Sequence, residues 1–301
     1  MSRRLLGLCT IACAAGLTCC ALLVGVERRS VAGAEAGDGG DGGCALDKPF
    51  GTPVLLAGIN TSDGEFSATL TRDEREIFIT AGTPAILMRA ERASTRDAFG
   101  ALAPVTELGG LPKPQMHASL SRDGLTLYIT AGPPGTRRLW RASRPSPGEP
   151  FATAARVTFP NWTERDTEQV MVTDRGAVYF VVQNGPQRDI MVAPPDGDGG
   201  WVTPVNWFFN TGPQSEEAPV ETPGGRRFYF AQGLSTTARQ IIQVDGDDPT
   251  NYTVSGSFSW SGMESALPVW ASADGCRLYV SILNGLGGAG GADIWVASRG
   301  R

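Results

Sequence analysis

Residues 119–142, SLSRDGLTLYITAGPPGTRRLWRA, decide the fold because four other stretches repeat their pattern about fifty residues apart. The stretch predicts a strand that ends at Ser121, a tight turn at 122–124, a second strand at 127–129 and a third at 139–142. Asp123 before Gly124 favours a hairpin turn, because Asp bonds nearby backbone and Gly adopts positive φ without steric cost. The β-branched and aromatic runs on either side supply strand propensity.

One aromatic residue of the second strand marks each repeat. These residues are Phe78, Tyr128, Tyr179, Tyr229 and Tyr279, and they are separated by 50, 51, 50 and 50 positions. A turn precedes each of them, at 71–73, 122–124, 174–176, 223–225 and 272–275. A spacing this regular predicts repeated supersecondary units.

A fourth element also recurs five times, as an aromatic residue followed by a short apolar strand. The pairs are Phe50 with 53–55, Phe99 with Val105, Phe151 with Val157, Trp201 with Val205, and Tyr252 with Phe258. The first pair precedes the first three-strand block, and the last block ends at Arg299 without one. We therefore expect an all-β, five-bladed β-propeller over residues 49–301, with four antiparallel strands per blade. Residues 53–57 would complete the blade whose other strands lie in 266–298, which closes the ring.

Three segments from two of the blocks resemble the TolB-type, WD-like propeller repeat. They are SRDGLTLYITAG (121–132), SADGCRLYVSILNG (272–285) and DIWVASR (293–299), and FGTPV (50–54) resembles the connecting strand of secreted bacterial members. The third and fourth repeats depart from the pattern at 174–176 and 223–225, where other turn-forming residues stand. The family includes periplasmic scaffold proteins, propellers attached to peptidases and a few carbohydrate-active enzymes. The resemblance therefore implies the fold much more strongly than an activity.

The first 36 residues predict an export signal. Arg3 and Arg4 precede an apolar run at 5–26, and small-residue cleavage sites follow at 32–34 and 34–36. The run is also long enough for an uncleaved membrane anchor, and LTCC at 17–20 offers a lipobox-like third possibility. Residues 37–48, which begin with a Gly/Asp-rich run, are expected to form a flexible tether. All three routes place the propeller in the periplasm, in the outer envelope or outside the cell, with membrane contact through the N-terminal segment alone.

The net charge limits the possible partners, and the cysteine content indicates the cellular compartment. The formal net charge is -5, and residues 1–36 carry four Arg against two Glu, which leaves -7 for the remainder. An acidic domain is a poor candidate for binding nucleic acid. Four of the six cysteines lie in 1–36, and the other two are Cys44 and Cys276. Both are expected in the last blade, so we predict a disulfide that locks the closure, with two free thiols as the alternative.

His117 is the only histidine, so any Ser-His-Asp or Cys-His mechanism must use it. It stands at the start of an expected inner strand, which would place it at the mouth of the central channel. A partly exposed polar residue at a strand end is the simpler interpretation. A single histidine also excludes a multi-histidine metal site.

Acidic and amide residues are expected to gather at the start of the inner strands. Counted back from those strands, Glu65, Gln115, Asp166 and Glu216 are predicted at equivalent places, with Glu168, Glu217 and Glu264 nearby. Such a ring could bind Ca²⁺ through oxygen ligands, or a cationic or hydroxyl-rich ligand. The simpler alternative is that these side chains cap loops or face solvent. No other cofactor is expected.

Two functions follow from these residues. The favoured one is a non-catalytic, monomeric binding or scaffold module of the cell envelope, with a protein, peptide or glycan at the channel mouth. The alternative is a glycoside hydrolase with a carboxylate pair from Glu65, Asp166, Glu216 and Glu264 at about 5 to 10 Å separation. Tryptophans in or beside connections could be exposed and stack on sugars; these are Trp162, Trp201, Trp207 and Trp260.

Overall fold

The structure is a computed structural model that describes residues 43–222, 224–235, 238–246, 251–283 and 287–301. The predicted export signal, most of the predicted tether and four cysteines fall in residues 1–42, outside the described residues. In the described ranges, no helix has the length and apolar character needed to cross a membrane.

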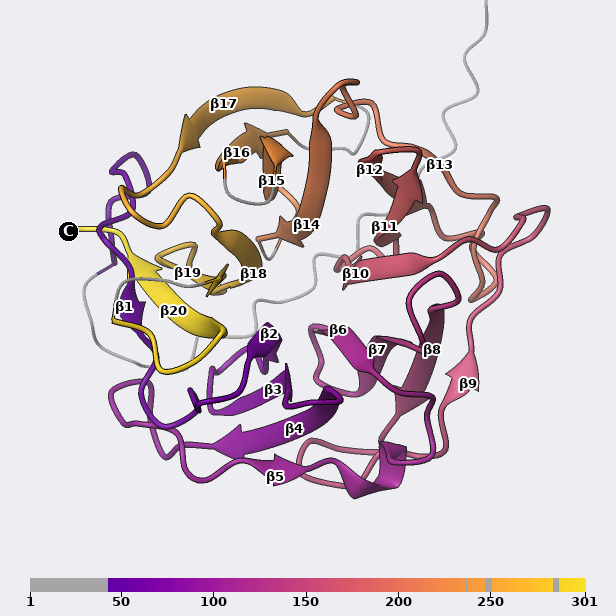
Figure 1. The fold of residues 1–301 in the computed structure, drawn as a ribbon, viewed down its shortest axis with the longest axis horizontal. Coiled ribbons are helices and arrows are strands. Elements are labelled where there is room, and N and C mark those ends of the chain that lie inside the picture. The colour runs from indigo at the N-terminus through magenta and orange to yellow at the C-terminus, as the bar shows by residue number, and fades with distance from the viewer. Residues whose placement is uncertain (1–42, 223, 236–237, 247–250, 284–286) are drawn as a thin grey trace, which may run out of the picture. The chain divides into compact units, whose positions relative to one another are not determined.

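Residues 43–301 form five four-stranded antiparallel sheets arranged around a centre (Figure 1). Blade 1 contains β2 (Glu65–Leu70), β3 (Glu76–Ala81), β4 (Ile86–Glu91) and β5 (Ala103–Pro104). Blade 2 contains β6 (Gln115–Leu120), β7 (Thr126–Ala131), β8 (Arg138–Ser143) and β9 (Ala155–Arg156). Blade 3 contains β10 (Thr167–Val172), β11 (Val178–Asn184), β12 (Gln187–Ala193) and β13 (Val205–Asn206). Blade 4 contains β14 (Ser215–Glu221), β15 (Arg227–Ser235), β16 (Ala238–Asp245) and β17 (Thr253–Phe258).

Blade 5 confirms the predicted closure of the ring. Its strands are β18 (Leu267–Ala271), β19 (Arg277–Leu283), β20 (Ala292–Ser298) and, from the other end of the chain, β1 (Val54–Leu55). Val54 pairs with Val296 and Leu55 with Trp295, so β1 lies beside β20 (Figure 1). The innermost strands contact one another in sequence, β18 against β2 included. The fold is therefore the predicted five-bladed β-propeller.

The predicted disulfide between Cys44 and Cys276 is present, and it fastens the start of the described chain to the last blade. Residues 44–48, expected to belong to the tether, are also held there. Ala45 N donates to Gly300 O at 3.0 Å, and the Arg299 guanidinium donates to the carbonyls of Leu46 and Lys48. The chain is thus fixed to the propeller several residues earlier than the sequence indicated.

The turn that opens each repeat is built as predicted, with one informative exception. In blade 2, Ser121 Oγ and Leu125 N both donate to Asp123, and Gly124 has φ of 73°. In blade 1 the glycine position is occupied by Glu74, which adopts φ of 59° and is buried. A positive φ is unfavourable for a residue other than glycine. The side-chain contacts of Glu74 offset this backbone strain.

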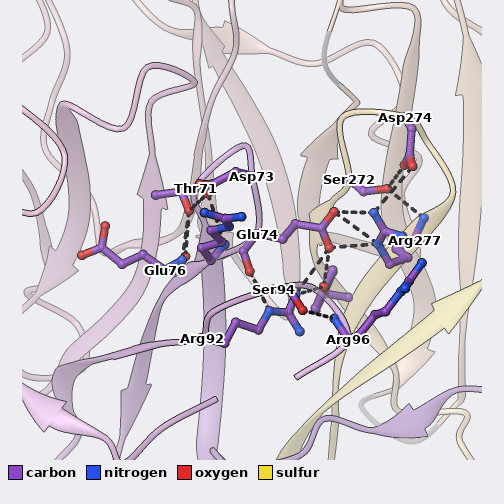
Figure 2. A network of polar contacts seen from close by, with 12 residues as sticks. Thr71, Asp73, Glu74, Glu76, Arg92, Ser94, Arg96, Ser272, Asp274 and Arg277 are labelled. Atoms are coloured by element: carbon purple, nitrogen blue, oxygen red, sulfur yellow. Dashed lines mark hydrogen bonds and ion pairs between the residues drawn. The ribbon is translucent and has the colours of Figure 1, made fainter. Parts of the chain in front are cut away.

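Glu74 joins the first blade to the last (Figure 2). Its carboxylate accepts hydrogen bonds from Arg277 Nη2 at 2.6 Å and from Tyr279 Oη at 2.6 Å, and Arg92 Nη2 lies 3.7 Å away. Burial, followed by the Glu74 charge, raises the pKa of Tyr279. The ring is therefore closed by a buried ion pair in addition to β1 and the disulfide.

The recurring aromatic residue before each outer strand has a structural role. In three blades an arginine at the end of the third strand stacks on it: Arg92 on Phe99 at 4.3 Å, Arg144 on Phe151 at 4.9 Å, and Arg299 on Phe50 at 4.0 Å. Trp207 and Trp260 are buried in the core. Their predicted exposure is wrong, because these side chains fill the spaces between blades.

Candidate functional site

The centre of the ring is lined by the five innermost strands, β2, β6, β10, β14 and β18 (Figure 1). Every one of them contains a β-bulge. In three neighbouring blades a non-glycine residue at the bulge has positive φ: His117 (40°), Gln169 (45°) and Ala218 (54°). A bulge re-aims the side chains of its strand, and these three residues line a channel cavity of about 30 Å³ together with Phe66 and Leu267.

The predicted ring of acidic residues is partly correct in register. Glu65, Gln115 and Glu216 are equivalent, because they pair with Ala81, Ala131 and Gln232 at the same level of their second strands. In blade 3 that place belongs to Thr167, which pairs with Val182. Asp166 therefore stands one residue outside the predicted position.

These residues connect blades instead of surrounding the channel. Gln115 accepts a hydrogen bond from Leu87 N at 2.7 Å in blade 1, and it donates to Leu108 O at 2.9 Å. Asp166 accepts from the backbone N of Arg137 at 2.7 Å and from its Nη2 at 2.8 Å, which links blade 2 to blade 3. Neither residue lines a described cavity of the channel.

Glu65 and Glu216 are fully buried, and each accepts a hydrogen bond from a threonine that precedes its strand. Thr61 donates to Glu65 through Oγ1 at 2.7 Å, and Thr211 donates to Glu216 through Oγ1 at 2.8 Å. Burial raises the pKa of both carboxyl groups, and the threonine hydrogen bonds act in the opposite direction. Both side chains are buried against the connections that lead into their strands, away from the solvent.

Glu264 lies on the surface, where its carboxylate accepts a hydrogen bond from Gly262 N at 3.0 Å. That bond lowers the pKa of Glu264. Across the part of the chain that the structure describes, no group of three or more His, Cys, Asp or Glu side chains could hold a metal ion. The predicted carboxylate ring for Ca²⁺ is therefore not assembled by these residues.

A chain of ion pairs does follow one end of the channel. Both oxygens of Glu168 are engaged, by Arg137 Nη2 and by Arg188 Nε at 3.5 Å. Both oxygens of Glu217 are engaged as well, by Arg188 Nη1 at 3.1 Å and by Arg239 Nη2 at 2.7 Å. We call these five residues, Arg137, Glu168, Arg188, Glu217 and Arg239, the charged mouth.

The three arginines of the charged mouth were missed in the sequence, although the repeat contains a signal for them. Arg137, Arg188 and Arg239 precede Leu139, Ile190 and Ile241 by two residues, and those three are equivalent members of the third strand. Blades 1 and 5 carry alanine at this place, Ala85 and Ala292. An arginine at one repeat position in three consecutive blades indicates a shared surface.

Gln169 connects the charged mouth to the channel cavity, and His117 lines the same cavity. Gln169 Nε2 donates to Glu217 at 3.2 Å, and Gln169 Oε1 accepts from Ala218 N at 2.7 Å. Burial, followed by the charges of Arg137 and Arg188, lowers the pKa of His117 to about 3. His117 is therefore neutral, and its buried Nδ1 has no hydrogen-bond partner within the described chain.

At the opposite end, the channel opens into a second cavity of about 80 Å³. The two cavities share Ala118, Val170, Pro219 and Val269, so they follow each other along the channel. We call the second one the turn-end cavity, because it reaches the turns that follow the inner strands. It contains Arg72, Arg122, Asp174 and Glu221, none of which the sequence indicated.

Comparison with solved structures identifies the fold. A TolB from Agrobacterium tumefaciens matches over 81% of this chain and 77% of its own, at 14% identity and a TM-score of 0.52. The fold is that of a TolB-type β-propeller. TolB from Acinetobacter baumannii matches at 18% identity and a TM-score of 0.48, over 79% of this chain and 56% of its own length. The chain thus spans just over half of that second TolB.

Two glycoside hydrolases also resemble this chain in fold. A thermostable family-43 glycoside hydrolase matches at 13% identity and a TM-score of 0.58, over 81% of this chain and 91% of its own. A family-117 glycoside hydrolase from Zobellia galactanivorans matches at 11% identity and a TM-score of 0.58, over 84% and 90%. No family model matches the chain, and no curated protein does. At these identities the likeness is one of fold alone.

Proposed function

We propose that this chain is an exported binding propeller that holds a hydroxyl- or amide-rich ligand, a glycan or a polar peptide segment of the cell envelope, at the charged mouth. One observation carries the proposal. Glu168 and Glu217 are carboxylates of the mouth with all four oxygens already occupied by guanidinium groups. Both carboxylates are buried. They therefore hold the three arginines in fixed positions, and no oxygen is free to carry a catalytic proton.

The same geometry argues against hydrolysis at this end. A glycoside hydrolase needs one carboxylic acid that gives a proton to the leaving oxygen and a second carboxylate across the bond. The four residues expected to provide that pair have other environments: Glu65 and Glu216 are buried, Asp166 binds Arg137, and Glu264 is on the surface. A binding role requires none of these groups to react.

The charged mouth offers complementary contacts for such a ligand. Arg188 is the most exposed arginine of the charged mouth and is held in place by Glu168 and Glu217. The neutral His117 presents a buried nitrogen without a partner in the described chain. Phe66 and Leu267 line the other side of the same cavity. A sugar or peptide that combines polar edges with an apolar face fits a site of this composition.

The proposal is tested by screening the mature domain against arrays of envelope glycans and peptides, with the hits measured by calorimetry. Arg188→Ala removes the guanidinium that bridges the two carboxylates, and we expect at least a tenfold loss of affinity. Arg156→Ala is the matched control, because Arg156 forms an exposed ion pair with Glu164 on an outer strand. Equal affinity in both variants, or no hit for the intact domain, would count against the proposal.

A glycoside hydrolase is the second candidate, and one observation favours it. Burial raises the pKa of Glu221 to about 7, and its carboxyl group lies beside Asp174 in the turn-end cavity. A carboxyl group with a pKa near neutrality beside a second carboxyl group is the arrangement of an acid and its partner. Release of reducing sugar that disappears in Glu221→Gln would establish this role. No release from a broad polysaccharide panel would remove it.

Export is proposed on the basis of the first 36 residues and the disulfide, since disulfides persist in oxidising compartments. We propose that residues 1–36 act as a signal or anchor and that the propeller is a monomer in the periplasm, the outer envelope or outside the cell. Cell fractionation, the intact mass of the mature chain and its mass in solution test the three statements. A full-length cytoplasmic chain would contradict export.

A further inference from the structure

The turn-end cavity contains a carboxyl group at a position where the repeat otherwise uses an apolar side chain. The inner strands end at equivalent residues, each paired with the residue just before the marker aromatic of the second strand. All five line the cavity, and they are Leu70, Leu120, Val172, Glu221 and Ala271. Glu221 is half-buried at this position. A carboxyl group beside apolar side chains opposes folding unless it is well paired.

The protein itself pairs Glu221 weakly. Asp174 N lies 3.3 Å from one carboxyl oxygen, and Tyr252 Oη lies 3.5 Å from the other while it also donates to Gly225 O at 3.0 Å. Burial raises the pKa of Glu221 to about 7; the negative charge of Asp174 adds to the rise, and Arg175 opposes it. Near neutrality the group therefore carries a proton that it can donate.

Two arginines stand at the rim of the same cavity. Arg72 and Arg122 occupy the same turn position in blades 1 and 2, and both are exposed. Arg122 is paired with Asp174, whose carboxylate also accepts from Gly224 N at 2.9 Å. Arg72 makes no hydrogen bond or ion pair with the described residues. The cavity thus offers one uncommitted positive charge.

We propose that the turn-end cavity binds the carboxylate of a small ligand, with Arg72 as its charged partner and the Glu221 carboxyl as a hydrogen-bond donor. A guanidinium and a carboxylate match in geometry, whereas a ligand amine would meet the uncommitted charge of Arg72. The apolar neighbours Leu70, Leu120 and Val172 accommodate a short alkyl group. This site lies at the other end of the channel from the charged mouth, and it stands independently of the function proposed there.

Propionate is a suitable probe, and propionamide is its neutral counterpart of the same shape. We would titrate each into the mature domain and follow the indole N–H signal of Trp270, which lines the cavity, by NMR. Saturable binding of propionate in the millimolar range is expected at pH 6. At pH 8 it should be about tenfold weaker, because the protonated fraction of a group with a pKa of about 7 falls by about that factor. Propionamide should bind at neither pH.

Variants separate this site from the charged mouth. Arg72→Gln, at an exposed position, should abolish propionate binding with no change in melting temperature, whereas Arg188→Ala and the outer-strand control Arg156→Gln should leave it intact. Equal binding of propionamide, unchanged binding in Arg72→Gln, or affinity that rises with pH would overturn the proposal. The last result would mean that the protonated Glu221 carboxyl is not the donor to the ligand. If Arg188→Ala loses the envelope ligand but still binds propionate, the charged mouth and the turn-end cavity are separate sites.

Discussion

His117 combines a strained backbone with a desolvated side chain at the channel wall, and its titration is measurable. Because the pKa is lowered from 6.5 to about 3, the ring should stay neutral at pH 5 in the folded protein. NMR of the imidazole nitrogens checks this directly. A midpoint near 6.5 would show that the ring is solvated and would remove it from the cavity wall.

The same shift predicts acid sensitivity. The folded-state pKa lies below the unfolded one, so the stability contributed by neutral His117 is present above about pH 6.5 and is lost as the pH falls towards 3. His117→Asn should lose less stability between pH 7 and pH 4, since Asn tolerates the positive φ and does not titrate there. Denaturant unfolding at both pH values measures the difference. Parallel losses in the two proteins would contradict the prediction.

Glu221 predicts the opposite pH dependence. Its folded-state pKa is raised from 4.5 to about 7, so its contribution to stability is present below about pH 4.5 and is lost as the pH rises through 7. Glu221→Leu, which copies Leu70 and Leu120, should stabilise the protein by about 1–3 kcal/mol at pH 8 and by much less at pH 5. Urea unfolding at the two pH values checks this. A variant that is less stable at pH 8 would mean that the carboxylate is well paired.

At the scale of elements, the aromatic spacing correctly predicted where the strands lie. It could not predict the strand register in every hairpin, because the turns differ in length. Leu120 pairs with Leu127, seven positions on, whereas in blade 3 Val172 pairs with Val178, only six positions on. The shorter turn moves the start of β10 by one residue. A fixed spacing therefore predicts Asp166 at the position that Thr167 occupies. Register errors of one residue change every side-chain assignment in a strand.

The arginines of the charged mouth could have been found from the sequence only by comparing third strands across blades. Carboxylates attract attention as catalysts, while Arg137, Arg188 and Arg239 form a pattern only when the repeats are aligned. The partners of Glu74, in contrast, are some 200 residues away, at Arg277 and Tyr279. Such a contact follows from ring closure and side-chain direction, which no local pattern specifies.

Glu74 also supplies a prediction about the blade 1 hairpin. Glu74→Gly restores the residue suited to φ of 59° but leaves Arg277 and Tyr279 without their buried acceptor. We expect a net loss of about 2–3 kcal/mol in the free energy of unfolding, since breaking a buried pair outweighs relief of strain. Glu164→Gln, in an exposed pair, should cost less than about 1 kcal/mol. A stabilised Glu74→Gly variant would show that strain dominates.

For the molecule as a whole, the fold could be predicted far better than the site, because the sequence pattern of one blade occurs five times. Ring closure, blade number and the disulfide all follow from that repetition. The channel depends on bulges and on single departures from the repeat, such as Glu221 among apolar equivalents, and each departure occurs once.

Closure gives the prediction that belongs to this scale. The Cys44–Cys276 bridge spans 232 residues, and a loop of that length constrains the unfolded chain strongly. The double variant Cys44→Ser, Cys276→Ser should lose about 2–4 kcal/mol yet keep its fold, since β1 pairing and the Glu74 ion pair remain. Denaturant unfolding gives the loss, and circular dichroism the fold. An unfolded variant would mean that the other two closures cannot hold the ring.

The backbone contact between Ala45 N and Gly300 O, at 3.0 Å, brings the beginning and the end of the propeller to the same spot. A peptide linker of a few residues would bridge them without disturbing a strand, and the chain could then be opened at any exposed turn between blades. The fold should therefore not depend on which blade comes first in the chain. Circular permutants that start at blade 2, 3 or 4 should fold to the same ring.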